Sequence, residues 1–235
     1  MCRILALETT EKNATVAVWE EGRLLLELCP EGWGAQTLAP AIQEILERLG
    51  WKSRDVQCVA VGIGPGSFTG LRLGVTTARV FAYAVGAKLI GIDTLEALAA
   101  GTGNEAKGET KKVSVAVDAQ REEIVAQNFE VDGDLAVPLG PQRLIPVDQW
   151  WDFGKSAGEN VVFASPILRR IESRVPQGIV LEDRARWNPQ AAQIGKIAIK
   201  RFEQGQFDDL WTLLPKYSRP SAAEERMKDS LPVPG

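Results

Sequence analysis

The fold class is decided by the segment Val56-Gln57-Cys58-Val59-Ala60-Val61-Gly62-Ile63-Gly64-Pro65-Gly66-Ser67-Phe68-Thr69-Gly70. It joins an apolar run, typical of a buried strand, to a glycine-rich turn. From the end of this turn to Val85 the chain is almost entirely apolar or small, which predicts a long helix. Thr69 is the expected N-cap of that helix, and Phe68 is expected to pack on Leu73 one turn later. A strand, a tight turn and a helix in this order indicate an α/β protein.

The elements on either side extend the pattern. Before the segment, the sequence predicts strands at Ile4–Leu7, Ala14–Trp19 and Leu24–Leu28 and a helix at Ala35–Leu49; after it come Lys88–Ile92 (strand) and Thr94–Ala100 (helix). The second half opens in the same way, with strands at Val113–Val117 and Glu123–Val131, and it ends with a helix from Asn188-Pro189 to about Gln204. The pattern predicts a duplicated α/β module with a degenerate second copy. We expect subdomains at residues 1–105 and 106–219 and a mobile tail at 220–235.

The composition excludes several classes of protein. The 235 residues include no histidine, which rules out a Ser-His-Asp triad, a histidine base and a histidine-ligated metal. A formal charge of -4 argues against a free-standing nucleic-acid binder. Three scattered cysteines favour free thiols. Without a long apolar stretch or a leader peptide, the expected location is the cytoplasm, with no membrane contact.

Two interpretations of the glycine turn remain open. Its backbone N–H groups could hold an anion or a nucleotide phosphate, with contacts from Gly64, Gly66, Ser67, Thr69 and Gly70. It is not a P-loop, since Leu71-Arg72 replaces the Lys-Ser/Thr pair. The alternative is a tight turn whose glycines permit close packing.

Polar residues at strand ends form the second candidate site. Glu8 and Thr9 end one predicted strand and Asp118 ends another, so they are expected to meet between the two halves. The two carboxylates could hold Mg²⁺ through water, or they could simply be polar strand ends.

The two long helices are more apolar than a single buried face requires. The apolar positions of residues 35–49 cover an arc of about 160°, whereas a surface helix needs only about 100°. On the second helix, Arg72, Thr76, Arg79 and Tyr83 form one narrow polar strip, and the remaining positions are almost all apolar or small. Both helices are therefore expected to make a second contact.

The eleven residues from Gly64 to Gly74 resemble the signature of the TsaB family, also called YeaZ. Support comes from Ile4–Thr9, Gln36–Pro40, Val117–Ala119 and the terminal pattern Pro215-x-Tyr217-x-Arg219-Pro220-x-Ala222. The resemblance implies an actin-like fold, of the sugar-kinase and heat-shock-ATPase type, without an active site of its own. It also implies a heterodimer with the catalytic subunit TsaD, joined by the ATPase TsaE, that places threonylcarbamoyl on adenosine in tRNA.

The resemblance further implies that this chain meets tRNA only through the complex, and that it has no cofactor of its own. ATP or ADP would then bind at the junction of the complex. The sequence departs from the family pattern at Glu8, where Asp is usual, at Gly34, where His is frequent, and at Gln120–Glu123, where Arg-x-Gly-Glu is usual. These departures weaken a nucleotide role for the cleft.

In this family the two apolar helices contact TsaD, or alternatively a second copy of the chain. The expected interface is Leu38, Ile42, Ile45, Leu49, Gly74, Ala78, Phe81 and Val85. The main alternative is an actin-like ATP-dependent small-molecule kinase or ATPase, which would need Glu8 and Asp118 for turnover. A peptidase is the weaker alternative, because nothing in the sequence places a histidine-free catalytic group.

Overall fold

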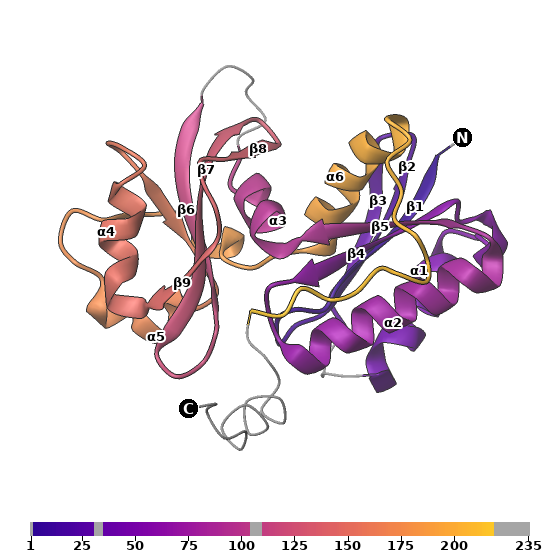
Figure 1. Cartoon of the computed structure of the whole chain (residues 1–235). Helices are drawn as coiled ribbons and strands as arrows, with labels where there is room; N and C mark the ends of the chain where they lie inside the picture. The colour runs from indigo at the N-terminus through magenta and orange to yellow at the C-terminus, as the bar shows by residue number, and fades with distance from the viewer. Residues whose placement is uncertain (1, 31–34, 104–109, 219–235) are drawn as a thin grey trace, which may run out of the picture.

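The computed structural model describes residues 2–30, 35–103 and 110–218, which form two α/β halves, each built on one sheet (Figure 1). The first half contains β1 (Arg3–Glu8), β2 (Thr15–Glu20), β3 (Arg23–Leu28), α1 (Ala35–Arg48), β4 (Cys58–Gly64), α2 (Phe68–Val85), β5 (Lys88–Asp93) and α3 (Thr94–Gly101). The second contains β6 (Lys111–Asp118), β7 (Glu123–Asp132), β8 (Leu135–Pro138), β9 (Arg143–Pro146), α4 (Trp150–Lys155), β10 (Val162–Ala164), α5 (Leu168–Ile171), β11 (Val180–Leu181) and α6 (Ala191–Glu203).

The two sheets repeat one topology. The first has the order β3-β2-β1-β4-β5 and the second β8-β7-β6-β10-β11. In the first sheet, β1 runs antiparallel to β2 and parallel to β4. In the second, β6 runs antiparallel to β7 and parallel to β10. The predicted duplication is therefore present. The second copy is reduced, since α5 has 4 residues where its counterpart α2 has 18.

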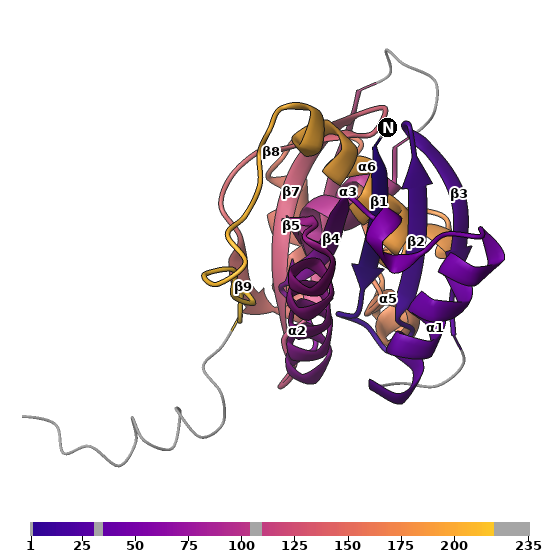
Figure 2. The same ribbon diagram turned by 90° about the vertical axis from the view of Figure 1, so that its right-hand side faces the viewer.

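The faces of the first sheet follow the alternation along its strands. Leu5 and Leu7 of β1 point to a core shared with α1 and α2, which lie on the same side of the sheet (Figure 2). Ile4 and Ala6 point to the opposite core, which α6 completes with Ile194. Each residue step along a strand reverses the side-chain direction, so β1 is buried on both faces.

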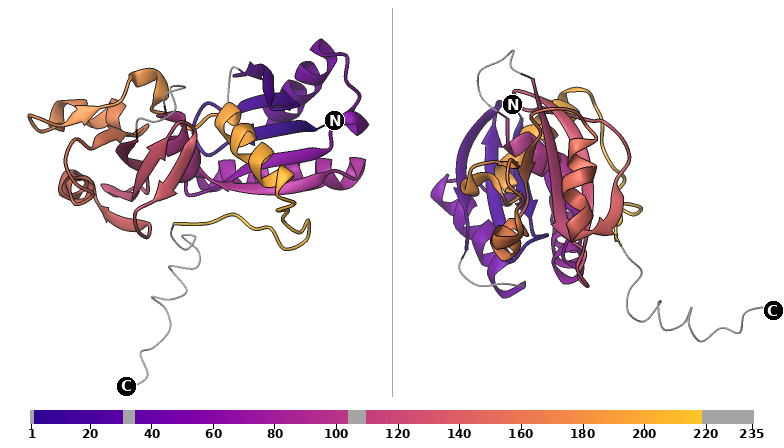
Figure 3. Two further views of the ribbon diagram at one scale, coloured as in Figure 1. Left: turned by 90° about the horizontal axis from the view of Figure 1, so that it is seen from above. Right: turned by 90° about the vertical axis from the view of Figure 1, so that its left-hand side faces the viewer.

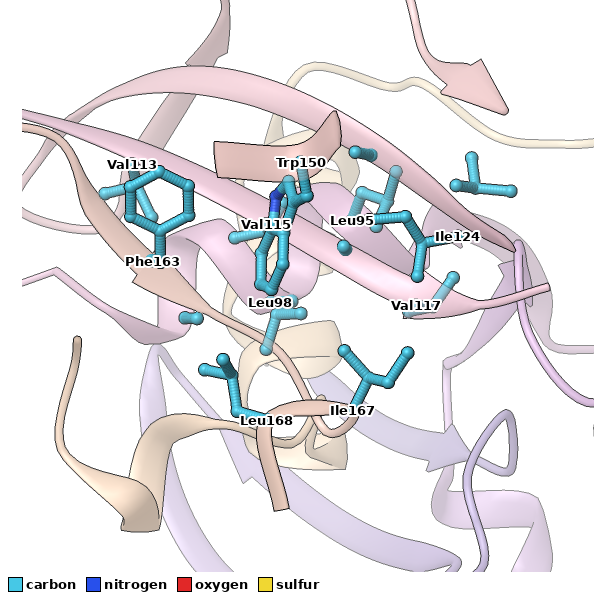
Figure 4. Packing of buried hydrophobic residues seen from close by; sticks show 14 of the residues in the cluster. Leu95, Leu98, Val113, Val115, Val117, Ile124, Trp150, Phe163, Ile167 and Leu168 are labelled. Carbon is cyan, nitrogen blue, oxygen red and sulfur yellow. The ribbon is translucent and has the colours of Figure 1, made fainter. Parts of the chain in front are cut away.

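The last helix of each half covers the sheet of the other half. Residues of α3 pack with β6 and β7 in the second core, which also contains Trp150 and Phe163 (Figure 4). Helix α6, although it follows the second sheet in the sequence, packs on β1 and β2 of the first. Both helices consequently lie between the sheets and hold the halves together (Figures 1 and 3).

Three local predictions are wrong. Ser67, not Thr69, is the N-cap of α2, and Phe68 packs on the ring of Tyr217. Helix α6 begins at Ala191 with Gln190 as N-cap, two residues after the predicted Asn188-Pro189 start. Its predicted end is confirmed, since Gly205 has a φ of 68° just beyond the helix. The predicted tail at 220–235 and most of the predicted boundary near 105 lie outside the described residues.

Candidate functional site

The end of β1 packs directly against the glycine loop. The hydroxyl of Thr9 donates a hydrogen bond to the carbonyl oxygen of Gly70 (2.8 Å), and the backbone N–H of Ser67 donates to the carbonyl oxygen of Thr10 (2.9 Å). Ser67 Oγ in turn accepts from the N–H of Gly70 at 3.3 Å. Thr9 and Thr10 are fully buried in this contact. The polar groups of Ser67 and Gly70 in the loop are therefore paired within the chain.

The glycines are required by this close packing. A Cβ at Gly70 would overlap the carbonyl oxygen of Thr9, and one at Gly74 would overlap the Thr9 hydroxyl. At Gly66 the Cβ would come within 2.5 Å of the Thr10 side chain, and at Gly64 within 2.5 Å of the carbonyl oxygen of Lys216. The faces that a phosphate would need are thus filled by the chain itself. Of the two interpretations of the loop, the geometry favours close packing.

Glu8 is a buried carboxyl with an uneven set of partners. Its Oε1 accepts hydrogen bonds from the N–H and the hydroxyl of Thr10, at 2.6 and 2.5 Å. Its Oε2 is buried against Gly62 with no partner among the described residues. Burial raises the pKa of Glu8, although the Thr10 hydrogen bonds oppose the shift. Since the charged form is disfavoured, Glu8 is poorly suited to hold Mg²⁺.

Glu11 is an acidic residue close to Glu8 and Asp118 that the sequence did not reveal. Burial, followed by the negative charges of Glu8 and Asp118, raises its pKa to about 7, and Arg169 opposes the shift. The negative charges of Glu8 and Asp118, at the ends of β1 and β6, thus both act on the carboxyl group of Glu11. Its position in a loop after β1 offered no periodic signal.

Asp118 is engaged in the turn that follows β6. Its Oδ1 accepts from the N–H of Gln120 at 2.8 Å, and its Oδ2 lies 3.3 Å from an Nη of Arg170. Arg174 continues the network by binding both Glu122 and Asp148. Among the residues that the structure describes, no three Cys, Asp or Glu side chains are grouped so that they could hold a metal ion. Asp118 is therefore already engaged by a backbone N–H and by Arg170.

The structure corrects the predicted interface on α1 and α2. Four of the eight residues point into the chain's own core: Leu38, Ile45, Gly74 and Ala78. They cannot contact a partner while the helices lie on the sheet. Ile42 is nearly buried as well, and Leu49, Phe81 and Val85 are partly exposed. The periodicity located the apolar positions but could not separate the inner from the outer side of each helix.

An open groove lies between α1 and α2. It has a volume of about 750 Å³ and is lined on the α1 side by residues that include Ala39, Ile42 and Leu46. The α2 side contributes Thr77, Val80, Phe81 and Ala84, and Val80 is 62 % exposed. The second contact expected of the two helices stays a prediction, and this groove is where such a contact would be made.

The polar strip of α2 holds a segment of the same chain. Residues 206–218, here called the strap, run back from α6 along α2 (Figures 1 and 3). Arg79 donates to the carbonyl oxygens of Leu210 and Trp211, at 2.6 and 3.2 Å, and Arg72 donates to the hydroxyl of Tyr217 at 3.2 Å. No local sequence signal could reveal contacts between residues more than 130 positions apart.

Residues 35–178 match the family model described as "TsaD: tRNA N6-adenosine threonylcarbamoyltransferase". A tRNA threonylcarbamoyladenosine biosynthesis protein TsaB of Escherichia coli is 29 % identical over 230 residues, covering 96 % of this chain and 98 % of the relative. The TsaB protein of Bacillus subtilis is 24 % identical and covers 97 % and 98 %.

The chain belongs to the TsaB (YeaZ) family. A solved Pseudomonas aeruginosa YeaZ structure superposes with a TM-score of 0.76 at 25 % identity, covering 92 % of this chain and all of that one. An inorganic polyphosphate/ATP-glucomannokinase of Arthrobacter has a TM-score of 0.50 at 13 % identity over 87 % of the chain, a likeness that concerns the fold alone. The actin-like, kinase-type fold expected of the TsaB family is confirmed. No helix in the described ranges has the length and apolar character of a membrane span.

Proposed function

We propose that this chain is a non-catalytic subunit of the machinery that makes threonylcarbamoyladenosine in tRNA. It would bind a TsaD-type catalytic subunit through the groove between α1 and α2, and TsaE and tRNA would join through that complex. The full-length similarity to proteins named for this biosynthesis carries the pathway. The proposed role within this pathway rests on the glycine loop, on Glu8 and on the α1–α2 groove.

The cleft supports the non-catalytic part of the proposal. Thr9 and Thr10 fill the space over the glycine loop, and burial favours the neutral form of Glu8. The fold-related alternative, an ATP-dependent kinase or ATPase, needs that space for phosphate. Any ATP or ADP of the complex would then bind at the junction with the partner.

The groove supports the binding part of the proposal. It opens between two helices, Val80 and Ala84 on its α2 wall are exposed, and its lining is mainly apolar but includes Gln43, Glu47 and Lys52. Such a groove accepts an apolar helix face from a partner, whose anchoring side chains would enter between the two walls. A second copy of the chain could occupy the same groove when no TsaD-type subunit is present.

Val80→Asp tests the groove. A carboxylate at this exposed position leaves the fold intact but must be buried unpaired when a partner docks, which costs several kcal/mol. We expect the variant to melt within a few degrees of wild type and to lose co-purification with the TsaD-type subunit by at least tenfold. Val180→Asp, at a position 51 % exposed on β11, is the matched control and should bind normally. Retention of the complex by Val80→Asp would overturn the assignment of the groove.

A calorimetric titration with ATP and Mg²⁺ separates the proposal from the kinase alternative. The isolated chain should give no binding heat at millimolar nucleotide. A saturable signal that is lost in Glu8→Ala or Asp118→Ala would favour the kinase.

A further inference from the structure

The strap covers the edge of the first sheet mainly through main-chain groups. The N–H of Asp208 donates to the carbonyl oxygen of Leu89 (2.8 Å), and Asp208 Oδ2 accepts from the N–H of Gly91 (2.8 Å). Farther along, the N–H of Lys216 donates to the carbonyl oxygen of Ile63 at 2.7 Å. Because β5 is the edge strand of its sheet, the bonds to Leu89 and Gly91 occupy groups that would otherwise face solvent, and the bond to Ile63 reaches the end of β4.

The strap contributes few apolar side chains to the core. Leu213, 8 % exposed, is its one buried side chain and contacts the first core near Gly91, and the partly buried Leu210 packs against the same core. Trp211 and Leu214 point outward, with 68 % and 66 % of their surfaces exposed. Local stability follows the amount of apolar surface that a segment buries, so the strap is held far less firmly than β1 or β4.

The junction with α6 allows the strap to move as a unit. Gly205 lies between the end of α6 and the strap and has a φ of 68°, a region that glycine adopts without strain. On the far side of this residue, α6 stays fixed between the two sheets. A rotation at Gly205 would release the strap and remove only Leu213 and the partly buried Leu210 from the first core.

We propose that residues 206–218 are a detachable strap, which opens about Gly205 without unfolding of the first sheet and uncovers a binding site for an extended peptide. The strap itself shows which chemistry that site accepts. Arg79 donates hydrogen bonds to two main-chain carbonyl groups, and the N–H of Gly91 donates one to a carboxylate. The part of the first core that contacts Leu213 accepts an apolar side chain. A peptide of the type Asp-(any four)-Leu, lying along β5, meets these requirements. This site is distinct from the α1–α2 groove and does not depend on the proposed function.

The N–H of Gly91 is a single-residue probe of the opening. Amide-resolved hydrogen exchange on the full chain should show Gly91 and the strap amides exchanging at least a hundredfold faster than the β1 and β4 amides, by a local opening. Leu213→Ala should raise the amide exchange rates of Gly91 and the strap a further tenfold. The exchange rates of the β1 amides relative to the β4 amides should stay unchanged. Leu26→Ala, which removes a partly buried leucine of β3 from the same core, is the control for general destabilisation.

A peptide added in trans tests the binding site. A synthetic peptide with the sequence of residues 206–218 should restore the protection of Gly91 in the Leu213→Ala variant, with a saturable dependence on concentration. The same peptide carrying Asp208→Ala and Leu213→Ala should not. The proposal is overturned if wild-type Gly91 exchanges at the rate of β1 and β4, if Leu26→Ala accelerates Gly91 as much as Leu213→Ala does, or if the wild-type peptide restores no protection.

Discussion

Residues in the glycine loop hold the tip of β1 against α2, and this contact leads to a first prediction. Gly70→Ala and Gly74→Ala would each push a methyl group into Thr9, so each should lower the free energy of unfolding by about 1–3 kcal/mol or more. Chemical denaturation measures the loss. Gly140→Ala is the control, because a Cβ there meets no atom within 4 Å and stability should be unchanged. Equal stability in all three variants would contradict the packing role.

Glu11 makes stability depend on pH. Its pKa of about 7, against an ordinary value of 4.5, means that the folded chain retains a proton that the unfolded chain releases between these pH values. The free energy of unfolding should therefore fall as pH rises from 4.5 to 7, by up to about 3 kcal/mol from this group, and then level off.

The variant Glu11→Gln isolates that contribution. Glutamine carries no charge at any pH, so the variant should gain stability relative to wild type as pH rises from 4.5 to 7 and keep the gain above pH 7. Urea denaturation at several pH values between 4 and 8 gives the difference in unfolding free energy between the variant and wild type as a function of pH. Glu27 and Glu96 also have raised pKa values, but they affect both proteins alike. A difference that stays constant with pH would contradict the assignment.

Single residues were predicted in part from the sequence. The glycine loop was correctly predicted to follow a strand, and Glu8 and Asp118 to end strands, because turn glycines and polar strand ends leave local signals. Ser67 was missed as the cap, since Thr69 is an equally good capping residue and only the backbone conformation distinguishes them. The effect of Glu11 depends on charges brought together from both halves, which no local pattern contains.

At the scale of elements, the turn between β6 and β7 is strained. Gln120, Arg121 and Glu122 have φ values of 63°, 54° and 57°, three successive left-handed residues of which none is glycine. Each costs about 1–2 kcal/mol relative to the right-handed form. The ion pairs of Glu122 and Asp118 with Arg170 and Arg174 hold the turn in place.

Glycine should relieve part of this strain. Gln120→Gly is expected to raise the free energy of unfolding by about 0.5–1 kcal/mol, the strain released less the extra entropy of the unfolded chain. Gln120→Ala keeps the strain and should give no gain. Thermal and urea denaturation measure the stability of both variants. An equal gain in Gln120→Gly and Gln120→Ala would mean that removal of the side chain, and not relief of strain, causes it.

The helices α1 and α2 show what hydrophobic periodicity can and cannot predict. The bounds of α1, the end of α2 and the excess of apolar positions on both helices were predicted from spacing alone, whereas α2 begins two residues before its predicted start. The inner and outer sides were not separated, and for that reason Ala78→Asp would be a poor test of binding. It would bury a carboxylate under α2 and unfold the first half, whereas Val80→Asp changes only the groove.

At the scale of the whole molecule, the halves are connected at both ends of the central helices. On one side Asp93 caps α3 through the N–H of Leu95 (3.0 Å) and also binds Gln142 at 2.7 Å and Lys216 at 3.4 Å. On the other side Asp134 of the second half binds Lys196 and Lys200 of α6. The two sheets are thereby joined by charges as well as by α3 and α6.

Asp93 permits the cap and the connection to be separated. Asp93→Ser keeps a capping oxygen but cannot reach Gln142 and Lys216, and should cost about 0.5–1 kcal/mol of unfolding free energy. Asp93→Ala loses the cap as well and should cost about 1 kcal/mol more. Denaturation curves of the two variants give the difference. Equal losses would mean that Asp93 Oδ1 does not cap α3.

The duplication was predicted from the repeated strand pattern, and the equal strand orders of the two sheets confirm it. The exchange of α3 and α6 between the halves was not predicted, because periodicity shows that a helix has an apolar side but not which sheet will cover it. The short elements α4, β8 and β9 were missed for another reason. They contain too few residues for any period to emerge.

The position of the strap in the chain has a consequence for biosynthesis. β5 ends at residue 93, and the segment that covers its edge begins at residue 206, so a ribosome adds more than a hundred amino acids between the two. Throughout that interval the nascent polypeptide carries an open strand edge, the feature through which unfinished proteins stick to one another. Messages cut short before the strap codons should therefore yield aggregates, and a chaperone that shields β5 until translation finishes would benefit this protein more than one that acts on the completed chain.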